Sequence, residues 1–108
     1  KTRTRNGPMI YHLLSPAYWA QFEQEAAYIS ESLATENFIH CSRHEQIAGV
    51  LERFYGDVSE LLLLHIDESK LTSPLLYEAV PDSTETFPHV YGPINREAIV
   101  KISWGKQS

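Results

Sequence analysis

Leu61-Leu62-Leu63-Leu64-His65-Ile66 is an almost unbroken apolar run in the second half of the chain. The run is too short for a good helix, and apolar residues at nearly every position are typical of a strand buried on both faces of a sheet. It therefore predicts a central strand, followed by a turn over residues 67–72.

Strands and helices are expected to alternate before this strand. Residues 9–14 form a short apolar strand. Ser15 and Pro16 are typical of a helix start, and apolar residues then recur at helical spacing, which predicts a first helix ending near Tyr28. Residues 32–37 are expected to be a connection, and Asn37 tolerates the left-handed conformation before the next strand.

A second strand and helix follow directly. Residues 38–41 predict a strand, and Ser42-Arg43-His44-Glu45 matches a capping box, in which Ser42 caps the Glu45 amide and the Glu45 side chain reaches back. An apolar stripe at helical spacing then predicts a second helix that packs on a sheet and stops at Gly56. The stripe consists of Ile47, Val50, Leu51 and Phe54.

The remainder reads mostly as strands, over residues 75–80 and 98–102. Pro88, Gly92 and Pro93 limit ladder pairing between them, so residues 87–93 are expected to form a shaped loop. This order predicts an α+β domain with two main helices on a predominantly antiparallel sheet. Its expected extent is residues 9–103, with a flexible lead-in or cloning remnant over 1–8 and a tail over 104–108.

Bulk properties restrict the classes of function. With 108 residues, 43% of them hydrophobic, the chain should form one folded domain. A formal net charge of -5 argues against tight binding to a long nucleic acid. The one cysteine excludes an internal disulfide, and the lack of a long apolar stretch or secretory segment predicts a cytoplasmic protein without membrane contact.

Three histidines lie at edges between apolar and polar runs, where reactive groups are often found: His12, His40 and His89. Strand pleating should point His40 and Ser42 one way and Cys41 the other, into the core. An anion such as a phosphate could then lie against the backbone amides of residues 43–45, with Ser42 or His40 as a donor. The alternative is that Ser42 is only a helix cap and His40 only a half-buried strand residue.

The other two histidines carry the same ambiguity. His12 would face a cleft or fill the sheet edge, and His89 would be held by a rigid loop or lie on a plain bend. Convergence of the three rings on zinc is an alternative that only geometry can decide. His44 and His65 are expected to be structural, and Glu78, at a strand end after Tyr77, is a candidate base or ribose ligand.

Several motifs together carry a resemblance to a known family, and they run from about Met9 to Ile102. They are Ile10-Tyr11-His12, Ser32-Leu33, Glu36 to Ser42, Glu45-Gln46, Arg53-Phe54-Tyr55, Leu61 to Asp67, Leu76-Tyr77-Glu78 and Phe87-Pro88-His89-Val90-Tyr91-Gly92-Pro93-Ile94. In order and spacing they resemble the small bacterial family called domain of unknown function 952. That family is regarded as a minimal relative of the ADP-ribosyltransferase fold, which implies a split sheet that grips NAD.

The resemblance also implies roles for individual residues. His12 is similar to the first-strand histidine that contacts the adenosine ribose, and residues 38–55 to the segment that flanks nicotinamide. Residues 87–94 replace the segment that holds the transferases' catalytic glutamate. They contain His89 but no acid, which leaves Glu78 as a substitute. The expected catalytic residues are His40, His89 and Glu78, and the expected ligand-binding residues are Tyr11, His12, Phe38, Ser42, Arg43, Tyr55, Tyr77 and Tyr91.

Two functions are therefore expected ahead of others. The first is an ADP-ribosyltransferase-like enzyme that takes NAD, an ADP-ribosyl compound or a phosphorylated nucleotide as substrate, with no certain cofactor. The second is a nucleotide-binding or protein-interaction module without chemistry. A histidine-based, metal-dependent hydrolase is the third.

Overall fold

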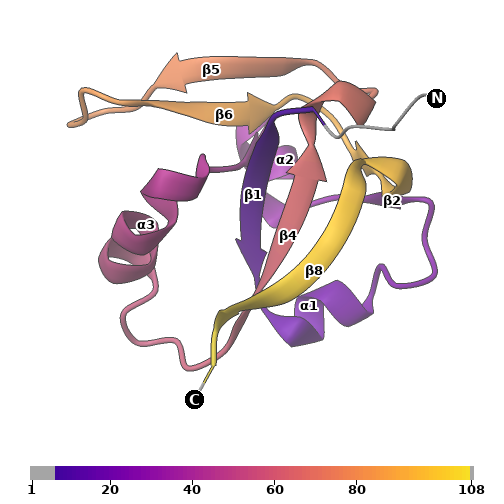
Figure 1. The fold of residues 1–108 in the computed structure, drawn as a ribbon, viewed down its shortest axis with the longest axis horizontal. Coiled ribbons are helices and arrows are strands. Elements are labelled where there is room, and N and C mark those ends of the chain that lie inside the picture. The colour runs from indigo at the N-terminus through magenta and orange to yellow at the C-terminus, as the bar shows by residue number, and fades with distance from the viewer. Residues whose placement is uncertain (1–6, 108) are drawn as a thin grey trace, which may run out of the picture.

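A computed structural model describes residues 7–107 of the chain (Figure 1). Its helices are α1 (Pro16–Ala20), α2 (Glu31–Glu36) and α3 (Ile47–Phe54), with short 3-10 turns at His44–Gln46, Glu68–Lys70 and Arg96–Ala98. Its strands are β1 (Met9–Leu14), β2 (Ala27–Tyr28), β3 (Ile39–His40), β4 (Leu61–Asp67), β5 (Leu75–Ala79), β6 (Thr86–Val90), β7 (Ile94–Asn95) and β8 (Ile99–Lys106).

The apolar run forms β4, which lies between β1 and β8 in a three-stranded antiparallel sheet. This confirms the predicted central strand. Alternate β4 side chains enter two apolar clusters. Leu64 and Ile66 pack with Trp19 and Tyr28 in the main core, whereas Leu63 lies in a second cluster against α3. β4 is therefore covered on both faces.

A second antiparallel sheet, in the order β3-β6-β5, crosses one end of the first (Figure 1). Within residues 7–107 the two are joined at a single bridge, where Tyr11 and Ser42 exchange both backbone hydrogen bonds at 2.8 Å. A short β2-β7 pair completes the strands. The α+β class and the antiparallel, divided sheet are thus as predicted.

The first helix is much shorter than predicted. Ser15 caps the Tyr18 amide and Pro16 opens the helix, as expected, but α1 ends at Ala20. Beyond Ala20 the guanidinium of Arg96 donates to the backbone carbonyls of residues 22, 23 and 25. These carbonyls therefore do not need the amides of a continued helix as hydrogen-bond donors. Tyr28 consequently lies in β2, paired with β7, and not at a helix end.

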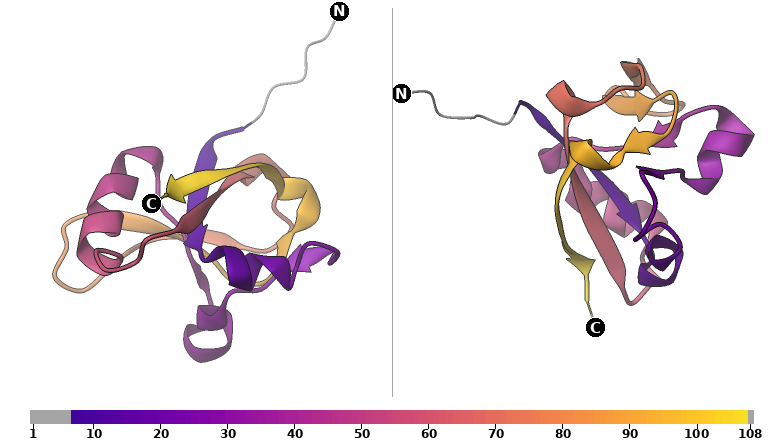
Figure 2. Two further views of the ribbon diagram at one scale, coloured as in Figure 1. Left: turned by 90° about the horizontal axis from the view of Figure 1, so that it is seen from below. Right: turned by 90° about the vertical axis from the view of Figure 1, so that its right-hand side faces the viewer.

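A helix not expected from the sequence, α2, occupies most of the predicted connection. None of its residues is buried, and Figure 2 shows it projecting from the body of the molecule in both views. Without an apolar face it gives no periodic signal. The expected left-handed residue is confirmed: Asn37 has a φ of 72° and donates its amide to Leu33 as the helix C-cap.

The segment expected to be a shaped loop is instead largely β6, the middle strand of the second sheet. Pro88 lacks an amide hydrogen, but its carbonyl accepts from Cys41 N at 3.0 Å, so the strand still pairs with its neighbour. Gly92, with a φ of 151°, ends this region. The prediction was wrong because it gave more weight to Pro88 and Pro93 than to the strand-forming residues around Pro88.

Both ends of the domain extend beyond the predicted bounds. Gly7 donates to the Asp67 carboxylate and the Pro8 carbonyl accepts from Glu68, so these two residues are fixed on the end of β4 and are not a flexible lead-in. The rest of that predicted lead-in, residues 1–6, lies outside the described residues. β8 reaches Lys106, which places residues 104–106 in the sheet.

Candidate functional site

A cleft of about 1230 Å³ lies along the second sheet, between it and the helices. His12, His40 and His89 all border it, together with Glu78 and eight aromatic side chains. The aromatic residues are Tyr11, Tyr18, Tyr28, Phe38, Phe54, Tyr55, Phe87 and Tyr91. Ligand pockets usually measure about 300 to 1,000 Å³, so this cleft has room for a ligand of dinucleotide size.

Glu78, on β5, holds two side chains from the β6 region. Its Oε1 lies 2.7 Å from Nδ1 of His89 and accepts a hydrogen bond of 2.5 Å from the Tyr91 hydroxyl. The hydrogen bond from Tyr91, and to a smaller extent the one from His89, holds the pKa of Glu78 below its usual range. Glu78 is therefore an ionised acceptor, and the pKa of Tyr91 is raised in return.

The ring of His89 is enclosed by aromatic neighbours. Phe38 stacks on it with a centroid distance of 4.0 Å, and the His40 ring lies edge-on at 5.5 Å. His89 is 3% exposed. Its Nε2 is buried and has no hydrogen-bond partner among the residues that the structure describes, which is an uncommon state for an imidazole nitrogen.

His40 is the exposed member of this group. About half of its side chain is accessible, and Nε2 lies 3.0 Å from the Glu36 carboxylate at the end of α2. Because β3 pairs with β6 so that His40 lies opposite His89, both rings stand on the same face of the second sheet. The predicted convergence therefore holds for these two rings.

His12 lies deeper and has a structural role. Its Nδ1 donates to the His40 carbonyl at 2.6 Å, and its Nε2 accepts from the Tyr28 hydroxyl at 2.8 Å. Burial lowers the pKa of His12 to about 4, so the ring is neutral and both nitrogens are occupied. His12 thus meets the backbone of β3 and not the rings of the other two histidines.

The predicted capping box is displaced by one residue, which changes the hydrogen bonds at the expected anion site. Arg43 is the N-cap, and its amide donates to the Gln46 side chain at 2.9 Å. The backbone N–H of Gln46 in turn donates to the Arg43 carbonyl, and the Glu45 carboxylate also lies at this turn. Of the three amides expected to bind a phosphate, that of Arg43 is thus engaged by the Gln46 side chain and that of Glu45 by its own carboxylate.

Two predicted ligand-binding residues lie away from the cleft. The Arg43 guanidinium binds the Thr86 carbonyl at 2.9 Å and stands over the Tyr77 ring. The Tyr77 hydroxyl donates to Glu68. Neither residue borders the cleft, whereas Tyr11, Phe38, Ser42, Tyr55 and Tyr91 do.

The expectations for three further residues agree with the geometry. Cys41 is buried in the main core, and burial raises the pKa of its thiol. His65 contacts the Ser103 hydroxyl at 2.8 Å, and His44 packs edge-on against Tyr11. All three act structurally.

The zinc alternative lacks a ligand set. Within residues 7–107 no group of three or more His, Cys, Asp or Glu side chains is placed to hold a metal ion. His12 uses both of its ring nitrogens in hydrogen bonds, which explains why the three histidines do not form such a group.

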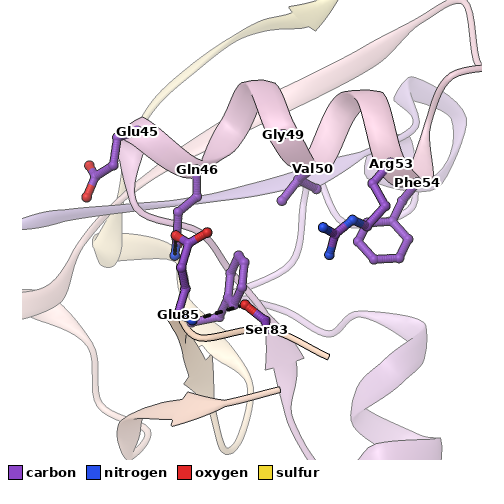
Figure 3. Close-up of a pocket in the computed structure, with 9 residues that line it drawn as sticks. Glu45, Gln46, Gly49, Val50, Arg53, Phe54, Ser83 and Glu85 are labelled. Carbon is purple, nitrogen blue, oxygen red and sulfur yellow. Dashed lines mark hydrogen bonds between the residues drawn. The ribbon is translucent and has the colours of Figure 1, made fainter. Parts of the chain in front are cut away.

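A smaller pocket of about 120 Å³ lies beside the cleft, between α3 and the turn that joins β5 to β6 (Figure 3). Val50, Arg53, Phe54 and Phe87 border both spaces, so the pocket extends the cleft at this end. Arg53 is the only Lys or Arg along the described walls of the cleft. It is therefore the one permanently charged cation on these walls.

Sequence reasoning missed two partners of the histidines. Tyr28 was assigned to a helix end, although a buried tyrosine needs a partner for its hydroxyl. Glu36 lies four residues before His40. That spacing was a usable signal, but it depends on the helix that the sequence did not reveal.

The family of the chain follows from its sequence. Residues 13–102 match the family described as protein of unknown function (DUF952). The chain belongs to this family. No curated protein matches this DUF952 chain.

Solved structures of one bacterial protein share the fold. The crystal structure of CC0527 from Caulobacter crescentus is 26% identical, with a TM-score of 0.78 over 89% of this chain and 84% of that one. A crystal structure of its double mutant gives 25% identity and a TM-score of 0.77 over 89% and 84% of the two chains. Its solution NMR structure gives 27% and 0.70 over 88% and 82%.

Among the described residues of this DUF952 chain, no helix is both long and apolar enough to cross a membrane.

Proposed function

We propose that this DUF952 chain binds an NAD-class or ADP-ribosyl nucleotide in the large cleft and transfers the ADP-ribosyl group. The observation that carries the proposal is the cluster of Glu78, His89 and Tyr91 within an aromatic-lined space of about 1230 Å³. NAD is chosen because the sequence motifs resemble a minimal ADP-ribosyltransferase fold. The cluster supplies the reactive group that the motif at residues 87–94 lacks.

The positions of the charged groups support this ligand class. Glu78 is ionised and partly exposed, so it can accept a ribose hydroxyl or oppose the positive charge that develops at the ribose C1′. Arg53, on α3, would meet the pyrophosphate. Phe38 and Tyr91 offer aromatic surface to the nicotinamide ring beside Glu78.

A non-catalytic binding module is the second candidate. The specific observation in its favour is the enclosure of His89 Nε2, which leaves the nitrogen with no accessible surface. A cleft that only binds a nucleotide would not need this atom to be reached.

Ligand-induced thermal shifts test the proposal. NAD, ADP-ribose and a 2′-phosphorylated nucleotide are each added to the wild type, Glu78→Gln and Tyr77→Phe. Tyr77→Phe is a matched control, since its hydroxyl lies outside the cleft. A ligand at 100 times its Kd adds about 2.7 kcal/mol of stability, which a melting curve resolves.

Nicotinamide release from NAD then separates the two candidates. Binding with release that Glu78→Gln abolishes and Tyr77→Phe preserves would support the transferase. Binding without release would leave the binding module. The absence of a shift with every nucleotide would reject both uses of NAD.

A further inference from the structure

The tautomer of His89 is fixed by its partner. Glu78 is an ionised carboxylate with no proton to donate, so the 2.7 Å contact requires a hydrogen on Nδ1 of His89. In the neutral ring, Nε2 then carries the lone pair. Tyr91 occupies the same carboxylate oxygen at 2.5 Å, which fixes Glu78 and, through it, the direction of the ring.

No described residue donates a hydrogen bond to this lone pair, and His89 is only 3% exposed to solvent. The residue nevertheless lines the cleft. A buried acceptor without a donor is unfavourable, because it has given up its hydrogen bond to water without a replacement. A ligand that brings an O–H to this nitrogen recovers that free energy. The neighbouring His40 ring, whose centroid lies 5.5 Å from that of His89, is about half exposed to solvent.

We infer that the acceptor in the proposed transfer is a neutral hydroxyl, from water or an alcohol, and that His89 Nε2 takes its proton. This inference rests on the proposed use of NAD. An amino or guanidino acceptor arrives as a cation at neutral pH, without the free lone pair that a nucleophile needs. A hydroxyl is neutral, has a lone pair for C1′ and has a hydrogen for Nε2.

The step balances with the groups named. The hydroxyl oxygen forms a bond to C1′ of the nicotinamide ribose, and the C1′–N bond breaks with its electron pair on the nicotinamide nitrogen, which leaves as neutral nicotinamide. The hydroxyl proton passes to Nε2. Glu78 remains a carboxylate and pairs with the imidazolium that results.

Product analysis tests the inference on the full chain. NAD is supplied in buffer, in buffer with methanol and in buffer with agmatine, a guanidine. Mass spectrometry is expected to find ADP-ribose in all three, its methyl riboside with methanol, and no agmatine adduct. An agmatine adduct in place of the methyl riboside would overturn the inference while leaving the proposed function intact.

Variants assign the proton transfer. His89→Gln is expected to slow nicotinamide release by about 100-fold or more while the NAD thermal shift remains. His65→Gln is the matched control, because it removes another strand histidine that does not border the cleft. If His89→Gln does not fold, His89→Asn takes its place, because its amide nitrogen lies near the position of Nδ1 and can still donate to Glu78.

A measurement without nucleotide keeps the two proposals apart. Long-range ¹H–¹⁵N spectra of the free wild type are expected to show His89 with its proton on Nδ1. The opposite tautomer, or unchanged release in His89→Gln, would overturn the role of His89. Failure of the wild type to bind any nucleotide would instead overturn the proposed function on which the hydroxyl assignment rests.

Discussion

His12 determines how acid should affect the fold. Burial lowers the pKa of His12 from 6.5 to about 4, so between these values the unfolded chain binds a proton that the folded chain does not. Stability therefore rises with pH across this window and is lost as the pH falls from about 6.5 to about 4. The shift corresponds to about 3 kcal/mol.

The prediction is checked with urea unfolding at several pH values. His12→Asn places an amide near Nδ1 that can still meet the His40 carbonyl but does not titrate. The wild type is expected to lose about 3 kcal/mol more than this variant between pH 7 and pH 4. Parallel losses in the two proteins would show that carboxylates, and not His12, dominate the acid response.

Tyr28 is the other half of this buried contact. Tyr28→Phe removes the hydroxyl that donates to His12 Nε2 at 2.8 Å and leaves a buried acceptor without a donor. We expect a loss of about 1 to 3 kcal/mol in the free energy of unfolding. Urea titration at pH 7 measures it. The double variant with His12→Asn should lose less than the two single losses combined, because the contact is already broken.

At the scale of elements, the start of α3 depends on Gln46 and not on Ser42. The Gln46 side chain accepts from the Arg43 amide and donates to the Thr86 carbonyl and the Glu85 carboxylate. Gln46→Met keeps the size of the side chain but loses all three bonds. We expect it to cost about 2 to 4 kcal/mol.

Ser42→Ala is the matched comparison for the helix start. The Ser42 hydroxyl caps no helical amide in the described structure, and the residue is held by backbone bonds to Tyr11. We expect it to cost less than about 1 kcal/mol. Equal losses in Ser42→Ala and Gln46→Met would favour the capping box that the sequence suggested.

The sequence predicted an element correctly wherever the spacing of its apolar residues matches the residues that the fold buries. β4 and β1 could be predicted because nearly all their residues are apolar, and the left-handed Asn37 because of its residue type. The end of α1 could not, since it depends on Arg96, more than seventy residues away. α2 could not be predicted either, since none of its residues is fully buried and it shows no apolar stripe.

The same division applies to the candidate site. His40 and His89 could be singled out as residues, and strand pleating correctly separated His40 from Cys41. The contact of His40 with Glu36 required the unforeseen helix α2, and that of His89 with Glu78 required the register of β5 and β6, which no local pattern encodes. The proline-rich run was the main obstacle, because it hid the strand that carries His89.

The whole molecule places its cleft where two sheets diverge. One backbone bridge, between Tyr11 and Ser42, connects them, and side chains from both sheets border the space beyond it. His12 connects the first sheet to β3 through the His40 carbonyl, whereas the His40 and His89 rings stand next to each other on one face of the second sheet. His12 therefore helps to hold the two sheets together, and the other two rings form part of the cleft wall.

The rate at which backbone amides exchange with solvent should differ between the buried strand β4 and the projecting helix α2. β4 is paired on both sides and covered on both faces, so its amides should exchange with solvent only on global unfolding. α2 buries none of its residues, and its amides should exchange fastest among the helices. Hydrogen exchange followed by NMR measures both. A nucleotide that contacts His40 should slow exchange in α2, which carries Glu36, and leave β4 unchanged.

Protection of the α2 amides equal to that of the β4 amides in the free protein would contradict this account, because it would require a partner surface that buries the helix.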